Sequence, residues 1–213
     1  FPYTTLFRSK NRQGRYRAAY DAAKNRFDLE AAFDIVERVL NKAVIERIAD
    51  AVADCPEPPR VVFPHPAFDD ENAAGFIDVD QKKLTNALPF AYARYLADRL
   101  GCEIDEDIDQ VARVGRTKLG IWLRFLCQPS FMGDVRTGSP YIIVDDTLTT
   151  GGTFAALRSY ILRQGGTVIA VSALAHKEGR SVPFQIAPPT LDVLLSLYGS
   201  DILPVWREAT GHE

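Results

Sequence analysis

Hydrophobic residues in the second half of this chain change their spacing, and the change predicts where strands and helices lie. The unbroken apolar run at 141–144 is typical of a strand that is buried on both faces of a parallel sheet. Apolar residues at helical spacing follow over 154–162, and Gly165 and Gly166 end that helix before a second apolar run at 167–175. The pattern predicts a strand, a helix and a second strand parallel to the first.

Upstream segments predict one more strand and two helices. Apolar residues at helical spacing over 28–53 predict a single long amphipathic helix, whose apolar stripe would pack against the sheet or a dimer partner. The run at 60–63 predicts the first sheet strand. A helix is expected to begin at Thr85 or Asn86 and to end at Gly101. The predicted fold class is α/β, a parallel twisted sheet flanked by helices, with helical additions at both ends.

The boundaries of these parts follow from the same pattern. Residues 1–9, which spell FPYTTLFRS, resemble a translated sequencing adapter, so we set them apart from the fold and do not expect the native protein to start at Phe1. We expect an N-terminal helical extension over 10–56, an α/β core over 57–187 and a C-terminal helical appendage over 188–213.

Composition narrows the classes of function. The 213 residues carry a net charge of −3, which argues against a nucleic-acid face as the main surface. The acidic run at 105–109 is expected to lie on a solvated surface. Three cysteines without a C-x-x-C motif predict free thiols in a reducing compartment, the cytoplasm. Apolar runs stay well short of 18 residues, so no membrane span is expected, and the histidines lack zinc-ligand spacing.

The candidate chemistry begins directly after the first apolar run. Asp145 and Asp146 precede a loop rich in hydroxyl groups and glycine, and this loop leads into the predicted helix. Unpaired backbone N–H groups and the helix dipole favour an anion at such a turn, and glycines let the backbone approach a phosphate closely. The loop has no lysine and no G-x-G-x-x-G pattern, so a monophosphate fits better than a triphosphate or a dinucleotide. The acids would then meet vicinal hydroxyls or a hydrated divalent metal.

Residues 141–153 resemble the signature of the type I phosphoribosyltransferases, an apolar strand followed by two acids and a T-G-G-T-like loop. The departure is Thr147, where the family usually has an aliphatic residue. The resemblance implies binding of 5-phosphoribosyl 1-pyrophosphate (PRPP), with Asp145 and Asp146 on the ribose hydroxyls. It implies Mg²⁺ bound through PRPP near these acids, with no direct protein ligand assigned. The residues that it assigns to the 5′-phosphate are Thr149, Thr150, Gly151, Gly152 and Thr153.

Further site residues follow from the same resemblance. The stretch 111–133 carries four cations and resembles the basic hood that closes on pyrophosphate in this family, with a looser likeness to ComF-like members. Arg113 and Lys118 are its candidate catalytic residues, and a solvated basic helix face is the alternative. Contacts to pyrophosphate or to the acceptor base are expected from His65, His176 and Lys177, for which polar surface turns are the alternative.

The function implied is transfer of the phosphoribosyl group to a nitrogen nucleophile, a nucleobase, with release of pyrophosphate. Thr149 stands where hypoxanthine-guanine members place an acid, which weighs against that subgroup. The partners implied are PRPP and a small-molecule acceptor, with neither membrane nor nucleic acid, and a homodimer stays open. The alternatives are a non-catalytic PRPP-binding regulator, such as a ComF-like accessory protein, and an unrelated α/β phosphate-binding enzyme.

Overall fold

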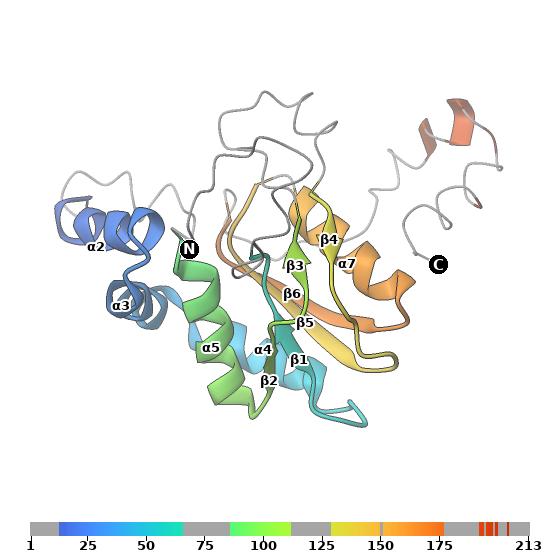
Figure 1. Cartoon of the computed structure of the whole chain (residues 1–213), viewed down its shortest axis with the longest axis horizontal. Helices are drawn as coiled ribbons and strands as arrows, with labels where there is room; N and C mark the ends of the chain where they lie inside the picture. Colours follow the sequence, from blue (N-terminus) through green and yellow to red (C-terminus); the bar gives the residue numbers. More distant parts are fainter. Residues whose placement is uncertain are drawn as a thin grey trace.

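A parallel sheet of four strands organises the chain (Figure 1). The computed structural model describes residues 13–65, 86–111, 129–149 and 151–176, with residues 192, 193, 195–197, 199 and 204. The strand order is β2-β1-β5-β6, and every neighbouring pair is parallel. The strands are β1 (Arg60–Val62), β2 (Glu103–Asp105), β5 (Pro140–Leu148) and β6 (Thr167–His176).

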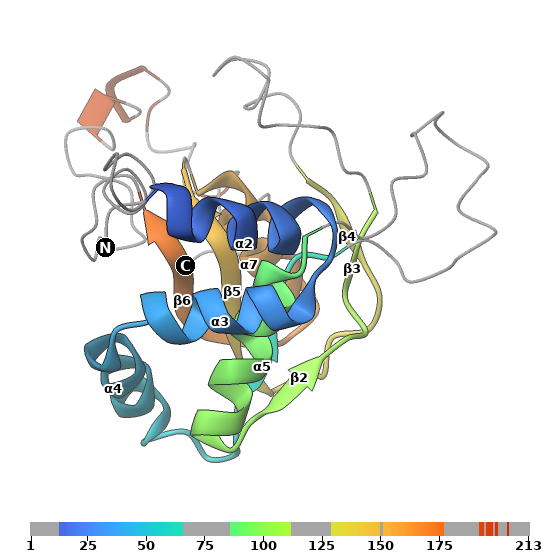
Figure 2. The same cartoon turned by 90° about the vertical axis from the view of Figure 1, so that its left-hand side faces the viewer.

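Helices cover both faces of this sheet. The helices are α2 (Gln13–Asn25), α3 (Leu29–Val39), α4 (Lys42–Val52), α5 (Leu88–Leu100) and α7 (Gly152–Arg163). α5 packs on β1 and β5 and carries α3 on its outer side, as Figure 2 shows, while α7 packs on β5 and β6. The predicted α/β class, with a parallel sheet flanked by helices, is confirmed.

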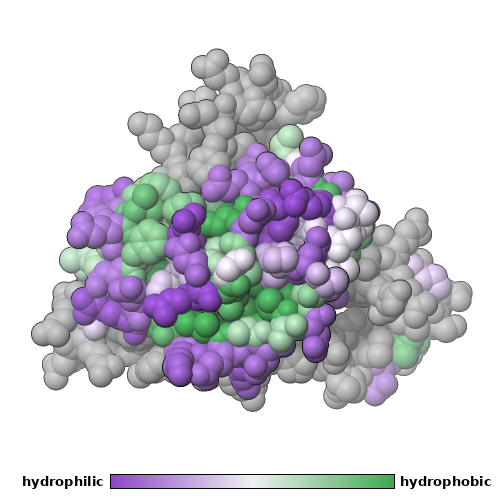
Figure 3. Space-filling model, turned by 90° about the horizontal axis from the view of Figure 1, so that it is seen from below, coloured by the Kyte–Doolittle hydropathy of each residue, from purple (hydrophilic) through white to green (hydrophobic). Residues whose placement is uncertain are grey.

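Successive residues of β5 enter two different hydrophobic cores, which explains its unalternating apolar sequence. Ile142 and Val144 belong to the core shared with α3, α4 and α5. Tyr141 and Ile143 belong to the core shared with α7. All four side chains are fully buried, because side chains of a strand alternate between faces and both faces are covered here. The molecule's lower face, in contrast, mixes hydrophilic and apolar residues (Figure 3).

The helix predicted over 28–53 is two helices, so that prediction was wrong about its continuity. α3 ends at Leu40, whose backbone is extended, and the Asn41 side chain accepts a hydrogen bond from the N–H of Ala43 and starts α4. Asparagine is among the preferred N-cap residues because its short side chain satisfies a free N–H of the first turn. The apolar spacing continues through the break, and Asn41 was the signal that marked it.

Other expected elements agree with the structure where it describes them. The side chain of Asn86 accepts from the N–H of Leu88 at the start of α5, and Gly101 ends that helix with φ of 66°. β6 begins at Thr167, as expected, after a turn in which Gly165 has φ of 85°. Cys55 and Cys102 are free thiols. None of the helices in the described parts of the chain is long and apolar enough to cross a membrane.

Asp105 is buried, which corrects the expectation that residues 105–109 form a solvated acidic patch. Its carboxylate accepts from Arg60 Nε at 2.9 Å and from the Tyr141 hydroxyl at 3.1 Å. Arg60 also pairs with Glu103 at 2.7 Å. A buried charge is tolerated when it is paired and hydrogen-bonded, and this network links the neighbouring strands β1, β2 and β5.

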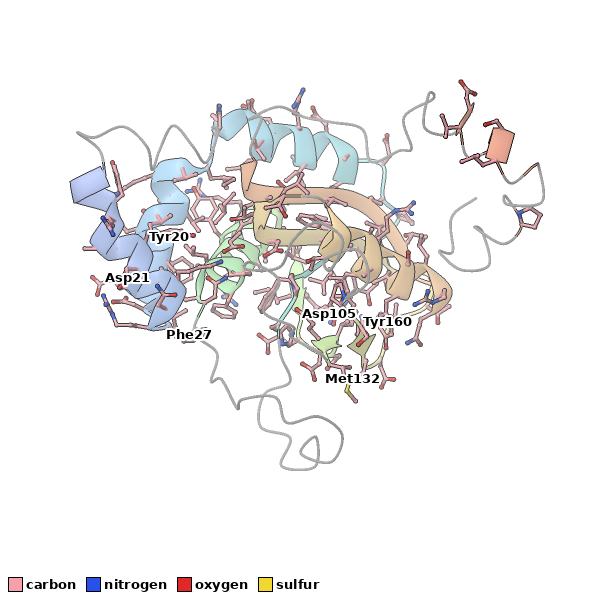
Figure 4. All side chains as sticks on the ribbon, turned by 90° about the horizontal axis from the view of Figure 1, so that it is seen from above. Tyr20, Asp21, Phe27, Asp105, Met132 and Tyr160 are labelled. Carbon is pink, nitrogen blue, oxygen red and sulfur yellow. The ribbon has the colours of Figure 1, made fainter. Side chains whose placement is uncertain are left out.

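A short antiparallel pair, β3 (Asp109–Gln110) with β4 (Phe131–Met132), stands beside the sheet. The Tyr160 hydroxyl of α7 donates to the Gly133 carbonyl at 2.6 Å and ties the pair to the helix. Figure 4 shows Tyr160 and Met132 on the opposite side of the molecule from Tyr20 of α2. The residues between β3 and β4, from 112 to 128, lie outside the described ranges.

We predict that Gly133→Ala destabilises the protein more than Gly138→Ala does. Both glycines have positive φ, 107° and 81°, so alanine costs about 1–2 kcal/mol at either position through backbone strain. At Gly133 an added Cβ would also lie 1.7 Å from the carbonyl oxygen of Asp107, whereas nothing lies within 4 Å at Gly138. Urea unfolding of the two variants measures the difference, and equal losses would contradict the predicted clash.

Candidate functional site

The two acids of the signature lie within β5 rather than beyond its end. The strand continues through Asp145 and Asp146 to Leu148, because β6 extends alongside it and pairs Asp145 with Ala173 and Leu148 with His176. The apolar run predicted only the first part of this strand. The acids are nevertheless close to the carboxyl edge of a parallel sheet, where open α/β sheets bind their ligands.

The side chains of the two acids leave the strand on opposite faces. Asp146 follows the alternation of Ile142 and Val144, which places it on the face covered by the N-terminal helices and α5. Asp145 follows Tyr141 and Ile143 and faces the side of α7. Alternation therefore separates the faces from which the two side chains leave, although the carboxyl groups still interact, since the charge of Asp146 and a side-chain hydrogen bond with it both act on Asp145.

Asp146 is bound by residues from two distant segments. Its Oδ2 atom forms an ion pair with the ammonium group of Lys24, in the last turn of α2. The same oxygen accepts from Nδ2 of Asn86 at 3.1 Å. The carboxylate of Asp146 is only 9% exposed, while the side chain of Lys24 is 32% exposed. These two partners make Asp146 a fixed, charge-compensated acceptor.

Sequence reasoning missed Lys24 altogether and named Asn86 only as a helix cap. Lys24 lies in a helix with no motif around it, and nothing local indicates that it reaches β5, 122 residues further along the chain. Asn86 directly precedes the N-cap residue of α5, Ala87. Its Oδ1 accepts from the N–H of Leu88, and its Nδ2 group donates to Asp146, 60 residues away.

Asp145 has the more unusual electrostatic environment of the two acids. Burial raises the pKa of Asp145 well above its usual value, and the neighbouring charge of Asp146 raises it further. The N–H of Asp146, which donates to Asp145 Oδ1 at 2.7 Å, and the charge of Lys24 oppose these effects. The site thus combines one carboxylate held by a cation with one carboxyl group that resists losing its proton.

The predicted anion-binding turn has the expected geometry where the structure describes it. α7 begins at Gly152, and the preceding Gly151 has the left-handed φ of 77° that glycine adopts without a Cβ penalty. The Gly151 carbonyl accepts from the N–H of Ala155 at 2.9 Å, which is the first hydrogen bond of the helix. N–H groups of a first helical turn have no partner within the helix, and they suit an anion. Thr149 is exposed before this turn, Thr153 is partly buried within it, and Thr150 lies outside the described residues.

His65 is buried just beyond β1, next to β5. Val62 of β1 pairs with Ile143 of β5. His65 lies three residues after Val62, and Asp146 lies three residues after Ile143. Because the two strands are parallel, His65 and Asp146 lie towards the same edge of the sheet. The side chain is 1% exposed, and Nδ1 lies 3.2 Å from Oδ1 of Asp109 on β3. Its environment differs from the surface turn that was the alternative for this residue.

The remaining predicted site residues receive less support. His176 ends β6 opposite Leu148, which brings its backbone to the edge of the sheet that carries the acids. Arg113, Lys118 and Lys177 lie outside the described residues, so their predicted roles stay predictions.

Sequence comparison finds relatives that are much longer than this chain. No family model matches it. Protein TraN of Escherichia coli is 37% identical over 193 residues, which cover 91% of this chain and 39% of TraN. An uncharacterized protein of Haemophilus influenzae is 39% identical over 79 residues, which cover 37% of this chain and 18% of that protein. The chain spans less than half the length of either relative.

Solved structures similar to this chain include several phosphoribosyltransferases. The adenine phosphoribosyltransferase of Thermoanaerobacter pseudethanolicus has a TM-score of 0.36 and 21% identity, covering 62% of this chain and 65% of that enzyme. The adenine phosphoribosyltransferase of Leishmania tarentolae has a TM-score of 0.39 and 16% identity, covering 81% and 69%. The hypoxanthine phosphoribosyltransferase of Trypanosoma cruzi has a TM-score of 0.37 and 18% identity, covering 74% and 71%.

We predict that asparagine at positions 145 and 146 changes stability in opposite directions. Because the pKa of Asp145 is raised in the folded state, the folded protein holds that proton more tightly than the unfolded chain does. Stability is therefore lost as pH rises from about 4, the usual value for aspartate, through the raised pKa. Asp145→Asn abolishes this loss and should raise the free energy of unfolding at pH 7.

Asp146→Asn should instead lower the free energy of unfolding by about 1–3 kcal/mol, because Lys24 loses the charged acceptor that compensates it. Urea unfolding at pH 7 and pH 5 measures both variants. The gain from Asp145→Asn should shrink at pH 5, and effects of the same sign at pH 7 would refute the asymmetry of the two acids.

Proposed function

We propose that this chain is a phosphoribosyltransferase that binds PRPP and transfers its phosphoribosyl group to a nitrogen nucleophile, a nucleobase, with release of pyrophosphate. The observation that carries the proposal is the geometry of the signature stretch. The acids near the end of β5 are followed by a helix that opens with Gly151 in the left-handed conformation. An acceptor site for hydroxyls and a donor site for phosphate thus adjoin each other, as the two ends of a ribose 5-phosphate require.

Each part of the stretch has a defined role in this proposal. Backbone N–H groups at Gly151, Gly152 and Thr153 bind the 5′-phosphate, with hydroxyl groups of Thr149 and Thr150 as further donors. Asp145 and Asp146 accept hydrogen bonds from the ribose hydroxyls. As the bond to pyrophosphate breaks, the ribose gains positive charge, and carboxylates beside it act where that charge develops.

Mg²⁺ enters this proposal together with the substrate. Groups of three or more His, Cys, Asp or Glu side chains that could hold a metal are absent from the described residues. Asp146 also already pairs with Lys24, a protein cation. In the proposal, Mg²⁺ would enter with PRPP and lie near Asp145 and Asp146, where it would neutralise charge on the leaving group.

Residues at neighbouring strand ends would contact the rest of the substrate. His65 follows β1, the strand beside β5, and it is buried next to Asp109. We assign it to pyrophosphate, and His176 and Lys177, at and after the end of β6, to the acceptor base. Arg113 and Lys118 would supply the positive charge of a hood that closes over pyrophosphate.

A second candidate function is a regulator that binds PRPP or a nucleotide without turnover, or a ComF-like accessory protein. It is favoured by Pro64 and Pro66, which stand where the resemblance expects small and basic residues around the pyrophosphate. The ion pair of Lys24 with Asp146 is equally compatible with a binding site that never turns over. The cytoplasmic location expected from the cysteines stays a prediction.

Two variants test the site with two ligands, inorganic phosphate and ribose 5-phosphate. The Asp145→Asn, Asp146→Asn double variant should keep its affinity for inorganic phosphate and lose affinity for ribose 5-phosphate, by about 1.5–3 kcal/mol for the charged hydrogen bond of Asp146. Gly152→Val places a branched side chain at the helix start and should weaken both ligands together. Titration calorimetry on the folded variants measures this, and a double variant with unchanged ribose 5-phosphate affinity would contradict the assignment of the acids.

Turnover separates the enzyme from the regulator. If Arg113 and Lys118 serve the leaving pyrophosphate, their charges contribute more in the transition state than in the resting complex, because negative charge grows there. Replacing both by alanine should then lower single-turnover rates far more than it weakens PRPP binding. Release of pyrophosphate with a panel of nucleobases provides the assay, and a wild-type protein that binds PRPP but is inactive with every base would favour the regulator.

A further inference from the structure

The N-terminal helix α2 is attached to the acidic site through its backbone as well as through Lys24. Ala22 and Ala23, directly before Lys24, are buried. The carbonyl of Ala23 accepts from the N–H of Ala87 at 2.8 Å, which fixes the end of α2 to the start of α5. The carbonyl of Ala22 accepts from the N–H of Asp28 at 3.2 Å, around a turn in which Phe27 takes a φ of 53°. The position of Lys24 is therefore set by the backbone around it.

Three segments converge on one oxygen atom of Asp146. Lys24 lies in α2, Asn86 directly precedes Ala87 at the start of α5, and Asp146 lies in β5. The hydrogen bond between Ala87 and Ala23 joins the first two segments. The positions of Lys24 and Asn86 relative to each other are therefore fixed by the backbone, independently of their contacts with Asp146. Such an arrangement presents a fixed pair of donors to Oδ2.

The occupied oxygen leaves the carboxylate able to accept more hydrogen bonds. An ionised carboxylate has about four acceptor positions, and both contacts described above are on Oδ2. Held on that side, Asp146 can direct Oδ1 towards a hydroxyl of a bound sugar without rotating. Among the described residues, its charged and polar contacts are with Lys24, Asn86 and Asp145, and Ala173 and Leu174 on the adjacent strand β6 are uncharged.

We propose that Lys24 is a positioning residue of the sugar site, supplied by the N-terminal helices and acting through Asp146. The inference rests on the proposed function, since it takes the acids as the acceptors of ribose hydroxyls. It makes α2 part of the functional unit. The contact described for Lys24 is with Asp146 on β5, away from the backbone N–H groups assigned to the phosphate, so its effect should be confined to ligands that carry the sugar.

The test compares inorganic phosphate with ribose 5-phosphate on Lys24 variants of the full chain. Lys24→Met keeps the aliphatic stem and removes the charge. It should weaken ribose 5-phosphate roughly tenfold, the scale of one charge-assisted hydrogen bond, and leave inorganic phosphate unchanged. Lys24→Arg retains the charge and should restore most of the affinity. In an Asp146→Asn background, Lys24→Met should have no further effect on ribose 5-phosphate.

Lys42→Met is the matched control, since Lys42 also lies in an N-terminal helix but is 88% exposed and paired with Glu46 at 3.1 Å. It should bind both ligands like the wild type. If Lys24→Met fails to fold, Lys24→Gln, which keeps a donor and loses the charge, takes its place in the comparison.

The outcomes separate this inference from the proposed function. A wild type that binds inorganic phosphate but not ribose 5-phosphate would overturn the proposed function. A wild type that binds ribose 5-phosphate, with a Lys24→Met variant of equal affinity, would overturn the positioning role alone. Equal weakening of both ligands by Lys24→Met would also overturn it, because that result indicates a general structural role.

Discussion

The contact of Asp146 with Lys24 and Asn86 is the interaction on which the architecture of the site depends. It crosses from the sheet to the helical layer that covers one face, and it joins residues that are 122 and 60 positions apart. Breaking a mostly buried ion pair leaves a charge without its partner, which costs more than the pair itself contributes. The contact therefore stabilises the packing of α2 against the start of α5 and fixes the carboxylate with it.

Because side chains alternate along β5, the adjacent acids Asp145 and Asp146 have different neighbours. Asp146 follows the face of the N-terminal helices and pairs with Lys24, whereas Asp145 follows the face of α7, where burial and the neighbouring charge of Asp146 act on it. The raised pKa of Asp145 and the ion pair of Asp146 are consequences of this division. A charged and a reluctantly ionised carboxyl group side by side form a site with less net charge than two free aspartates would have.

The proposed site is compatible with an enzyme or with a regulator, because in the proposal the acids and the helix start alone bind ribose 5-phosphate. Catalysis adds groups that respond to charge on the leaving pyrophosphate. His65, beyond the end of β1, contacts Asp109 of β3, and the cations proposed for the hood follow β3 in the sequence, outside the described residues. The hydrogen bond of Tyr160 to the carbonyl of Gly133, directly after β4, fixes the β3–β4 pair beside α7.

The sequence alone determined the parallel strands around residues 60–63, 141–144 and 167–175 and the start of α7. These features are local, since burial on both faces, helix spacing and the freedom of Gly151 are all visible in contiguous residues. Prediction from the sequence failed at Asn41, where the apolar spacing continues across the boundary between two helices. It also failed at Asp105, which was expected on a solvated surface and is buried.

Only the tertiary structure decided which partners the acids have. Lys24 carries no local signal, because a lysine in the last turn of a helix is typical of any solvated helix end. Its role arises when α2 packs beside α5 and brings its ammonium group to β5. Side-chain type and spacing define a strand, a turn and their chemistry, whereas the electrostatic environment of a carboxylate depends on what the rest of the chain places around it.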